Sequence, residues 1–346
     1  MQITPREFAQ RALIGASALS FFSSGCGTLS NRPAARSIRT VTGTIRADDL
    51  GITLPHEHVL VDFIGAAKTT PNRYNPDEVF EIALPHLRRV KELGCQSLAE
   101  CTPAYIGRDP ALLARLAQAA NLNLLTNTGY YGAGQNKYLP AHALAESADQ
   151  LAERWIREAK EGIAGAGIRP GFIKIGVDAG PLSDVHRKLV QAAARTHWAT
   201  GLTIAAHTGN GTAALAEIQT LTDAGLDPSA FIWVHAQSEP NQEAHARAAQ
   251  LGAWVEFDGI GPRSIEQHLK FVKMLRDRGF LNRILISHDA GWSNVGEPRG
   301  GSFRPFDTLF TEFIPALKTA QFTDAEINQL IVRNPREAFT IRVRGR

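Results

Sequence analysis

Cysteine, excess charge and long apolar runs are all scarce in this sequence of 346 residues, and each scarcity excludes a class of protein. The three cysteines, Cys26, Cys95 and Cys101, are too few for a disulfide framework, and their spacing matches no zinc ribbon or finger. The net charge of +3, from 37 basic and 34 acidic residues, is too small to indicate nucleic-acid binding. No run of 18 apolar residues occurs, so no membrane-spanning helix is predicted.

Residues 1–40 differ from the rest of the chain and resemble a bacterial export signal. Arg6 and Arg11 lie at the start of an apolar stretch, and Cys26 follows it where a lipoprotein signal carries its lipidated cysteine. We therefore expect an exported protein that is periplasmic or anchored to the membrane through a lipid on Cys26. The alternatives are export without lipidation and an ordinary N-terminal helix. Residues 1–40 are left out of the fold prediction.

From residue 41 to residue 346, short continuous apolar runs alternate with longer amphipathic stretches, and 44% hydrophobic with 21% charged residues is typical of a globular protein. The predicted strands are 52–54, 95–100, 122–127, 171–177, 202–207, 231–235, 253–257 and 284–289. The predicted helices are 77–93, 109–120, 141–164, 183–200, 212–224, 241–251, 264–278, 305–320 and 323–333.

Eight strand–helix units in this length predict an α/β fold, a single (β/α)8 TIM barrel over residues 41–346. The rival fold is a doubly wound open sheet, which needs a glycine-rich phosphate loop after the first strand. The first strand instead leads into His56-Glu57-His58, which favours the barrel.

Metal-binding residue types gather at the carboxyl ends of the predicted strands, which meet at the mouth of a barrel. They are His56, His58, Lys174, His207, His235 and Asp289. Each has a structural alternative, since a lone histidine at a strand end usually makes hydrogen bonds and Lys174 could pair with a buried carboxylate such as Glu100. Six such residues on five strand ends are hard to explain in this way, and they favour a metal centre.

Imidazole nitrogens and carboxylate oxygens are ligands for zinc, manganese, cobalt and iron. Four histidines and one aspartate exceed the three protein ligands of a mononuclear catalytic zinc site, so we predict two divalent metal ions per chain, with zinc as the first choice. A lysine between two cations would be repelled. Lys174 would fit if its amine had become a CO2-derived carbamate, whose anionic oxygens can bridge both metals.

Two segments make the resemblance to a known family specific. GITLPHEH at residues 51–58 closely matches the opening strand of the phosphotriesterase family of the amidohydrolase superfamily, and IGRD at residues 106–109 matches a family segment after the second strand. From about residue 41 to the C-terminus, the chain resembles that family. The candidate ligands also follow in the family order.

The resemblance implies a ligand set and a mechanism. His56, His58 and Asp289 would hold one metal, His207 and His235 would hold the other, and Lys174 would be the carboxylated bridging lysine. A metal-bridging hydroxide would attack a carbonyl or phosphoryl centre, and Asp289 would take the proton.

The sequence departs from the family pattern where organophosphate-cleaving members relay protons. Those members carry an aspartate three residues after the strand-6 histidine and a histidine in strand 7. Here Ser238 holds the first position, and strand 7 ends in Asp258-Gly259, where Asp258 could substitute in the relay or cap the loop. We therefore expect a lactone or carboxylic ester as substrate. The alternatives are phosphotriester or phosphodiester hydrolysis at the same site, and a metal-containing binding protein without activity.

Four side chains of the predicted mouth loops are candidates for substrate binding, namely Tyr105, Tyr131, Trp292 and Arg299. A phenol there could donate to a substrate carbonyl, and an arginine could bind an anionic group, although loop packing and solvated charge are the alternatives. The expected partner is therefore a small-molecule ester or lactone. A homodimer is compatible with the sequence, and membrane attachment is expected only through a lipidated N-terminus.

Overall fold

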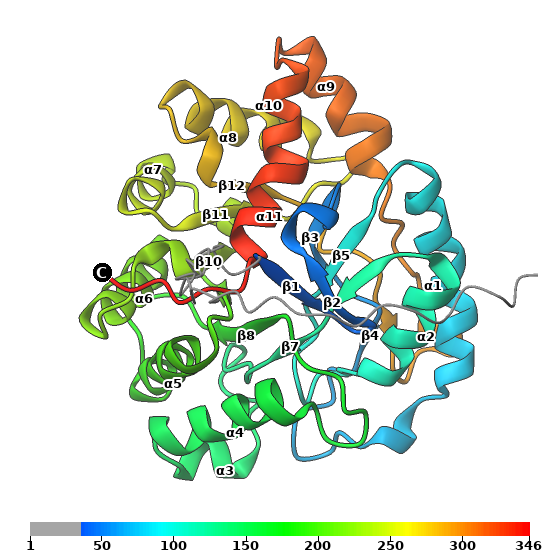
Figure 1. Cartoon of the computed structure of the whole chain (residues 1–346), viewed down its shortest axis with the longest axis vertical. Coiled ribbons are helices and arrows are strands. Elements are labelled where there is room, and N and C mark those ends of the chain that lie inside the picture. Colours follow the sequence, from blue (N-terminus) through cyan, green and yellow to red (C-terminus); the bar gives the residue numbers. More distant parts are fainter. Residues whose placement is uncertain (1–35) are drawn as a thin grey trace, which may run out of the picture. The chain divides into compact units, whose positions relative to one another are not determined.

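Eight parallel strand positions form the wall of a barrel in the computed structural model, which describes residues 36–346 (Figure 1). In order they are β3 (Thr53–Glu57), β5 (Ser97–Glu100), β6 with β7 (Asn123–Leu125 and Asn127–Thr128), β8 (Phe172–Val177), β9 (Ile204–Thr208), β10 (Phe231–Val234), β11 (Trp254–Phe257) and β12 (Ile284–Ile286). Each strand pairs with the next one along the chain. Backbone hydrogen bonds from Asp289 to His56 (3.2 Å) and from His58 to Ala290 (2.9 Å) join the last strand position to the first. The predicted barrel is confirmed.

The helices cover the outside of this wall. They are α1 (Pro76–Glu92), α2 (Pro110–Ala120), α3 (Ala141–Ala145), α4 (Ala148–Glu161), α5 (Asp184–Thr200), α6 (Gly211–Asp223), α7 (Gln242–Leu251), α8 (Ile265–Asp277), α9 (Ile314–Thr319), α10 (Asp324–Asn328) and α11 (Asn334–Phe339). Their buried apolar side chains pack against the outward-facing side chains of the strands, and this layer is the larger core of the molecule.

Several element boundaries differ from the prediction. The first strand continues to Glu57, so His56 lies within it. The helix predicted over 141–164 is two helices, because Ser147 begins α4 with a capping box to Gln150. The helix predicted from residue 305 begins only with a π-helical turn at Leu309–Phe313, and the last helix continues through a second such turn to the end of α11.

The inside of the barrel changes from apolar to polar along the strands. Near the amino ends, Phe172 and Leu285 belong to a second, inner cluster of buried apolar side chains. One inward position further along β8 is Lys174, and the next inward position, Gly176, is level with His207 of β9. The strand register therefore brings the predicted ligands to the carboxyl end of the barrel.

A hairpin that the sequence did not predict lies across the amino end of the barrel (Figure 1). Its strands β1 (Ser37–Thr40) and β2 (Gly43–Arg46) pair antiparallel, and Ile38 is fully buried in the inner cluster. The predicted boundary between residues 40 and 41 falls at the turn of this hairpin, so the folded unit begins before it, at Arg36. The predicted export signal and its Cys26 lie outside the described residues. Within residues 36–346, no helix is both long and apolar enough to cross a membrane.

At the opposite end, a short parallel pair extends the wall. Here β4 (Leu60–Val61) pairs with β13 (Ser293–Asn294), which fixes the loop after β12 to the segment that follows β3. Trp292 precedes β13 and is held at the mouth by this pairing.

Candidate metal centre

All six predicted ligands line one cavity of about 110 Å³ at the carboxyl end of the barrel. They are His56, His58, Lys174, His207, His235 and Asp289. Apolar side chains, among them Val61, Phe63 and Ile106, complete the wall on the side of the mouth. The site is therefore a small, largely apolar chamber with its polar groups gathered on one side.

Three ligand atoms converge in the first half of the site. The Nε2 atoms of His56 and His58 lie 3.3 Å apart, and Asp289 Oδ1 lies 3.7 Å from the first and 3.0 Å from the second. All three atoms lie within the span that a single metal ion can bridge. Two imidazole nitrogens and one carboxylate oxygen are a donor set that fits zinc or another first-row divalent cation.

Hydrogen bonds at the far side of each imidazole leave these Nε2 atoms free to bind a cation. His58 Nδ1 lies 2.7 Å from the hydroxyl of Thr102, which donates in turn to Glu100. A histidine that donates from Nδ1 presents the Nε2 lone pair, and a carboxylate behind it makes that nitrogen more basic. This chain of contacts also means that Glu100 supports His58 rather than pairing with Lys174.

Lys174 is 2% exposed and lines the cavity from β8. Among the described residues, no carboxylate oxygen lies within ion-pair distance of its amine, although the predicted structural alternative required one. An ammonium without a counter-ion is costly to bury, whereas a carbamate would carry the opposite charge and could bind cations. The surroundings of Lys174 therefore fit the predicted bridging role.

The second half of the site is formed by His207 and His235, whose ring centroids lie 4.6 Å apart. His207 is in β9, and burial followed by the nearby charge of His235 holds the pKa of its imidazole well below the usual range, so the ring is a neutral potential ligand. His235 follows β10 with a φ of 62°, a left-handed conformation that turns the chain away from the strand.

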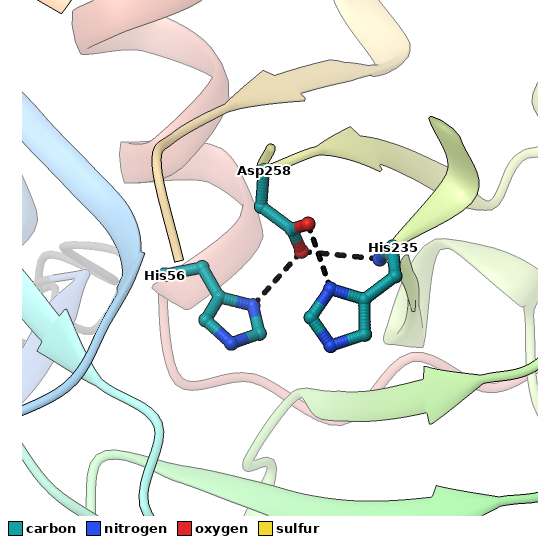
Figure 2. Close-up of side chains that lie close together, drawn as sticks. All are labelled: His56, His235 and Asp258. Atoms are coloured by element: carbon teal, nitrogen blue, oxygen red, sulfur yellow. Dashed lines mark hydrogen bonds and ion pairs between the residues drawn. The ribbon is translucent and has the colours of Figure 1, made fainter. Parts of the chain in front are cut away.

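One buried carboxylate connects the two halves. Asp258, directly after β11, places Oδ2 3.0 Å from His56 Nδ1 and Oδ1 2.7 Å from His235 Nδ1. Figure 2 shows both imidazoles directed at this carboxylate from opposite sides. The same group also accepts from the backbone N–H of His235 and from the Gln237 side chain.

A second acidic residue of β11, Glu256, lies beside this unit. Its Oε2 is 3.2 Å from His56 Nδ1, and burial together with the negative charge of Asp258 raises its pKa well above the usual range. Burial alone would also raise the pKa of Asp258, but the charges and hydrogen bonds of His235 and His56 lower it well below its usual range. The pair is therefore divided into a neutral Glu256 and an ionised Asp258.

Glu57 fixes the segment that carries Asp289. Its fully buried carboxylate accepts hydrogen bonds from Ser287 Oγ (2.8 Å), His288 Nδ1 (2.6 Å) and the backbone N–H of Ala290 (2.8 Å). Asp289 has a φ of 51°, a conformation that is uncommon for a residue other than glycine and is sustained by such contacts. Burial alone would raise the pKa of Asp289, but the hydrogen bond and charge of His58 lower it.

Two of the four candidate substrate-binding residues line the cavity. Tyr131 packs edge-on against His207, and Trp292 packs edge-on against His58. The ring of Tyr131 fits there because residue 176 is glycine: a Cβ at Gly176 would lie 2.7 Å from the Tyr131 Cδ2 atom.

The other two candidates, Tyr105 and Arg299, do not reach this cavity. Tyr105 packs against Tyr130 and His142 behind the wall, and Arg299 lines a separate surface pocket with Arg73. The loops after β5 and β12 carry them outward, a direction that sequence position does not reveal.

The supporting carboxylates were largely missed by sequence reasoning. Asp258 was considered only for a proton relay or a loop cap, and Glu57, Glu256 and Thr102 were given no role. One signal was present, because Glu57, Glu256 and Asp258 are acidic residues in or directly after apolar strands, where an unpartnered charge is costly. Their partners could not be inferred, since Glu57 and His288 are 231 residues apart.

Comparison with known proteins agrees with the barrel fold. A model of the phosphotriesterase family matches residues 36–339. The phosphotriesterase homology protein of Escherichia coli (strain K12) is 30% identical, covering 84% of this chain and 99% of that protein. An aryldialkylphosphatase of Saccharolobus solfataricus is 26% identical, covering 86% of this chain and 97% of that protein. An N-acetyltaurine hydrolase of Dictyostelium discoideum is 25% identical, covering 88% of this chain and 98% of that protein. The solved organophosphorus hydrolase from Deinococcus radiodurans superposes with a TM-score of 0.80 at 28% identity, covering 89% and 98% of the two chains.

Proposed function

Because this chain belongs to the phosphotriesterase family, we propose that it is a hydrolase that uses two divalent metal ions to cleave a lactone or carboxylic ester. The observation that carries the proposal is the convergence of His56 Nε2, His58 Nε2 and Asp289 Oδ1 on one point of the cavity. When bound, the metals supply a nucleophilic hydroxide near neutral pH and polarise the substrate oxygen.

The residues around the metals have separate roles in this proposal. Asp289, whose pKa is lowered below its usual range, accepts the proton of the attacking water at its carboxylate. Tyr131 stays protonated because burial raises its pKa, and its hydroxyl is available to donate to a substrate carbonyl. Trp292 and Phe63 form the apolar side of the mouth and receive the carbon skeleton of the substrate.

The choice of a carbonyl substrate rests on the missing proton relay. Ser238 stands where organophosphate-cleaving members of the family carry the relay aspartate, and strand 7 has no histidine to complete the relay. Asp258 does not replace them, since Oδ1 already accepts from His235 and Gln237 and Oδ2 lies 3.0 Å from His56 Nδ1. The relative named N-acetyltaurine hydrolase supports the same preference, because N-acetyltaurine has a carbonyl as its electrophilic centre.

Phosphotriester hydrolysis is the second candidate. It is favoured by the names of two similar proteins, the aryldialkylphosphatase and the organophosphorus hydrolase. A binding protein without turnover is disfavoured, because all six candidate ligands are present and line one cavity.

The test is proton release by the metal-loaded full-length chain on a panel of lactones, carboxylic esters and organophosphates. We expect chelator-sensitive acid release on lactones or esters, reduced about 100-fold or more in Asp289→Asn, because general-base catalysis typically contributes that much. A higher rate on organophosphates would favour the second candidate. Two bound metals with no turnover on any substrate would favour the binding protein.

Lys174 provides a separate test of the carbamate. Lys174→Ala removes the predicted bridge, so we expect fewer than two metals per chain by elemental analysis and little turnover. An added short carboxylic acid, which can occupy the space of the carbamate, should restore part of both. Full activity of Lys174→Ala without added carboxylate would contradict the assignment, and Lys270→Ala, at an exposed lysine of α8 away from the cavity, is the matched control.

A further inference from the structure

We propose that Asp258 is a positioning residue that makes the two metals bind interdependently, an inference that rests on the two-metal site of the proposed function. Its carboxylate contacts His56 Nδ1 through Oδ2 at 3.0 Å and accepts from His235 Nδ1 through Oδ1 at 2.7 Å (Figure 2). In the ligand assignment above, His56 serves one metal and His235 serves the other. A single buried group therefore orients one ligand of each half.

The Asp258 carboxylate has no remaining capacity for another task. Oδ2 accepts from the His235 backbone N–H at 3.1 Å and lies 3.0 Å from His56 Nδ1, while Oδ1 accepts from His235 Nδ1 and from Gln237 Nε2 at 2.6 Å. The His56 Nδ1–H also reaches Glu256 Oε2 at 3.2 Å. Two oxygens offer about four lone-pair sites, and these three donors together with the His56 ring occupy them. Although Asp258 lies close enough to His56 and His235 to form a possible metal cluster, hydrogen bonding explains this proximity better than ligation.

The Asp258 carboxylate also cannot move with one imidazole and keep its contact with the other. Asp258 is fully buried, and its own backbone N–H donates to Gln237 Oε1 at 3.1 Å, so both its main chain and its side chain are fixed. A displacement of His56 on metal loss would therefore be transmitted through the shared carboxylate to His235, and the reverse. We therefore expect that a metal bound in one half of the site raises the metal affinity of the other half.

The experiment measures zinc release from the full-length chain, dialysed against buffers of graded free zinc concentration, with bound zinc counted by mass spectrometry. In the parent protein, we expect both zinc ions to leave over one narrow range of free zinc. The amide of Asp258→Asn has a single acceptor oxygen and cannot hold both imidazoles. The affinity for both zinc ions should then fall by about 10- to 100-fold, the usual effect of losing such a supporting group. The two zinc ions should also leave over separate ranges of free zinc, because no shared carboxylate couples their ligands.

Thr102→Val is the matched control, because Thr102 contacts His58 and therefore supports one half alone. Because Asp258 is intact in this variant, both zinc ions should still leave over one narrow range, shifted to a higher free zinc concentration. If Asp258→Asn releases both zinc ions over a range as narrow as that of the parent, the coupling is overturned. Circular dichroism spectra and melting temperatures of both variants show whether they fold.

Gln237→Met keeps the proposal testable if Asp258→Asn does not fold. It removes one donor to the Asp258 carboxylate and the acceptor of the Asp258 backbone N–H, and it leaves the carboxylate in place, so we expect a smaller fall in affinity that again affects both zinc ions. A parent protein that binds fewer than two zinc ions overturns the coupling together with the metal centre. A parent protein that binds two zinc ions but hydrolyses nothing overturns the proposed hydrolysis alone, because the coupling is read from zinc release.

Discussion

At the scale of single residues, the buried acidic side chains are of two kinds. Some accept hydrogen bonds from several donors, and others are kept neutral because burial raises their pKa. Glu57 and Asp258 are of the first kind, and Glu256 and Glu217 are of the second. Glu217, on the inner face of α6, is fully buried, and one of its oxygens lies 2.7 Å from the Thr208 hydroxyl while the other has no partner among the described residues.

Glu217 should make stability depend on pH. Burial raises its pKa from 4.5 to about 8, so between these values the folded chain retains a proton that the unfolded chain has released. Stability should therefore fall as pH rises from about 5 through 8, by up to roughly 4 kcal/mol in all. Glu217→Gln is neutral at every pH, so its melting temperature should match the parent near pH 4 and exceed it increasingly up to pH 9.

The measurement is a series of melting curves from pH 4 to pH 9 for the parent, Glu217→Gln and Glu81→Gln, in which the replaced carboxylate is exposed on α1. The exposed control should follow the parent at every pH. Parallel curves for the parent and Glu217→Gln would show that Glu217 is not the buried titrating group.

At the scale of elements, β3 and the end of β12 are joined by Glu57, and this contact positions Asp289. Glu57→Gln leaves one acceptor oxygen for donors that include Ser287, His288 and Ala290, so buried donors lose their partner. We expect a loss of about 3–5 kcal/mol in the free energy of unfolding, as for a broken buried charge network. Turnover should fall as well, because Asp289 is no longer held.

Ser287→Ala is the graded comparison, since it removes the hydroxyl that donates to Glu57 and accepts from the His56 backbone N–H but leaves the other donors to Glu57, at an expected cost of about 1–3 kcal/mol. Denaturant unfolding of both variants checks the order. Equal stabilities would mean that Glu57 is not the centre of this contact.

The sequence predicted the elements whose signal is local. Continuous apolar runs such as 231–235 marked buried strands, and the order of these runs with amphipathic stretches was enough for the barrel and for the mouth at its carboxyl end. The hairpin of β1 and β2 was missed because its residues are mostly polar or exposed, and only Ile38 is fully buried. The supporting contacts of Glu57 and Asp258 join separate strands, so no local pattern reports them.

At the scale of the whole molecule, the two ends of the barrel have separate tasks. The carboxyl end holds the candidate metal centre, and the amino end is closed by the β1–β2 hairpin and the last residues of the chain. The backbone N–H of Ile341 donates to Ser37 O at 2.9 Å, which joins the chain's C-terminal segment to the hairpin. This division predicts that a substitution that breaks contacts at the amino end lowers the free energy of unfolding without altering metal binding.

Arg344 joins several segments at that end through buried hydrogen bonds. It is 5% exposed, and its guanidinium donates to Thr203 Oγ1 at 3.0 Å and to the carbonyls of Glu337, Ala338 and Thr340 at 2.9–3.1 Å. Arg344→Met fills a similar volume but leaves these acceptors without a donor. Because each unsatisfied buried acceptor costs about 1–3 kcal/mol, we expect a total loss of roughly 3–5 kcal/mol and a lower melting temperature.

The Arg344→Met protein should keep two metals per chain and an unchanged KM, because Arg344 contacts none of the cavity residues. Arg346→Met is the matched control: Arg346 is exposed and its side chain donates only a long bond of 3.3 Å to Thr222, so its stability should be nearly that of the parent. Calorimetry and metal analysis on one preparation of each variant check both expectations. Loss of metal at an unchanged melting temperature would contradict the division, since the two ends of the barrel would then be coupled through its interior.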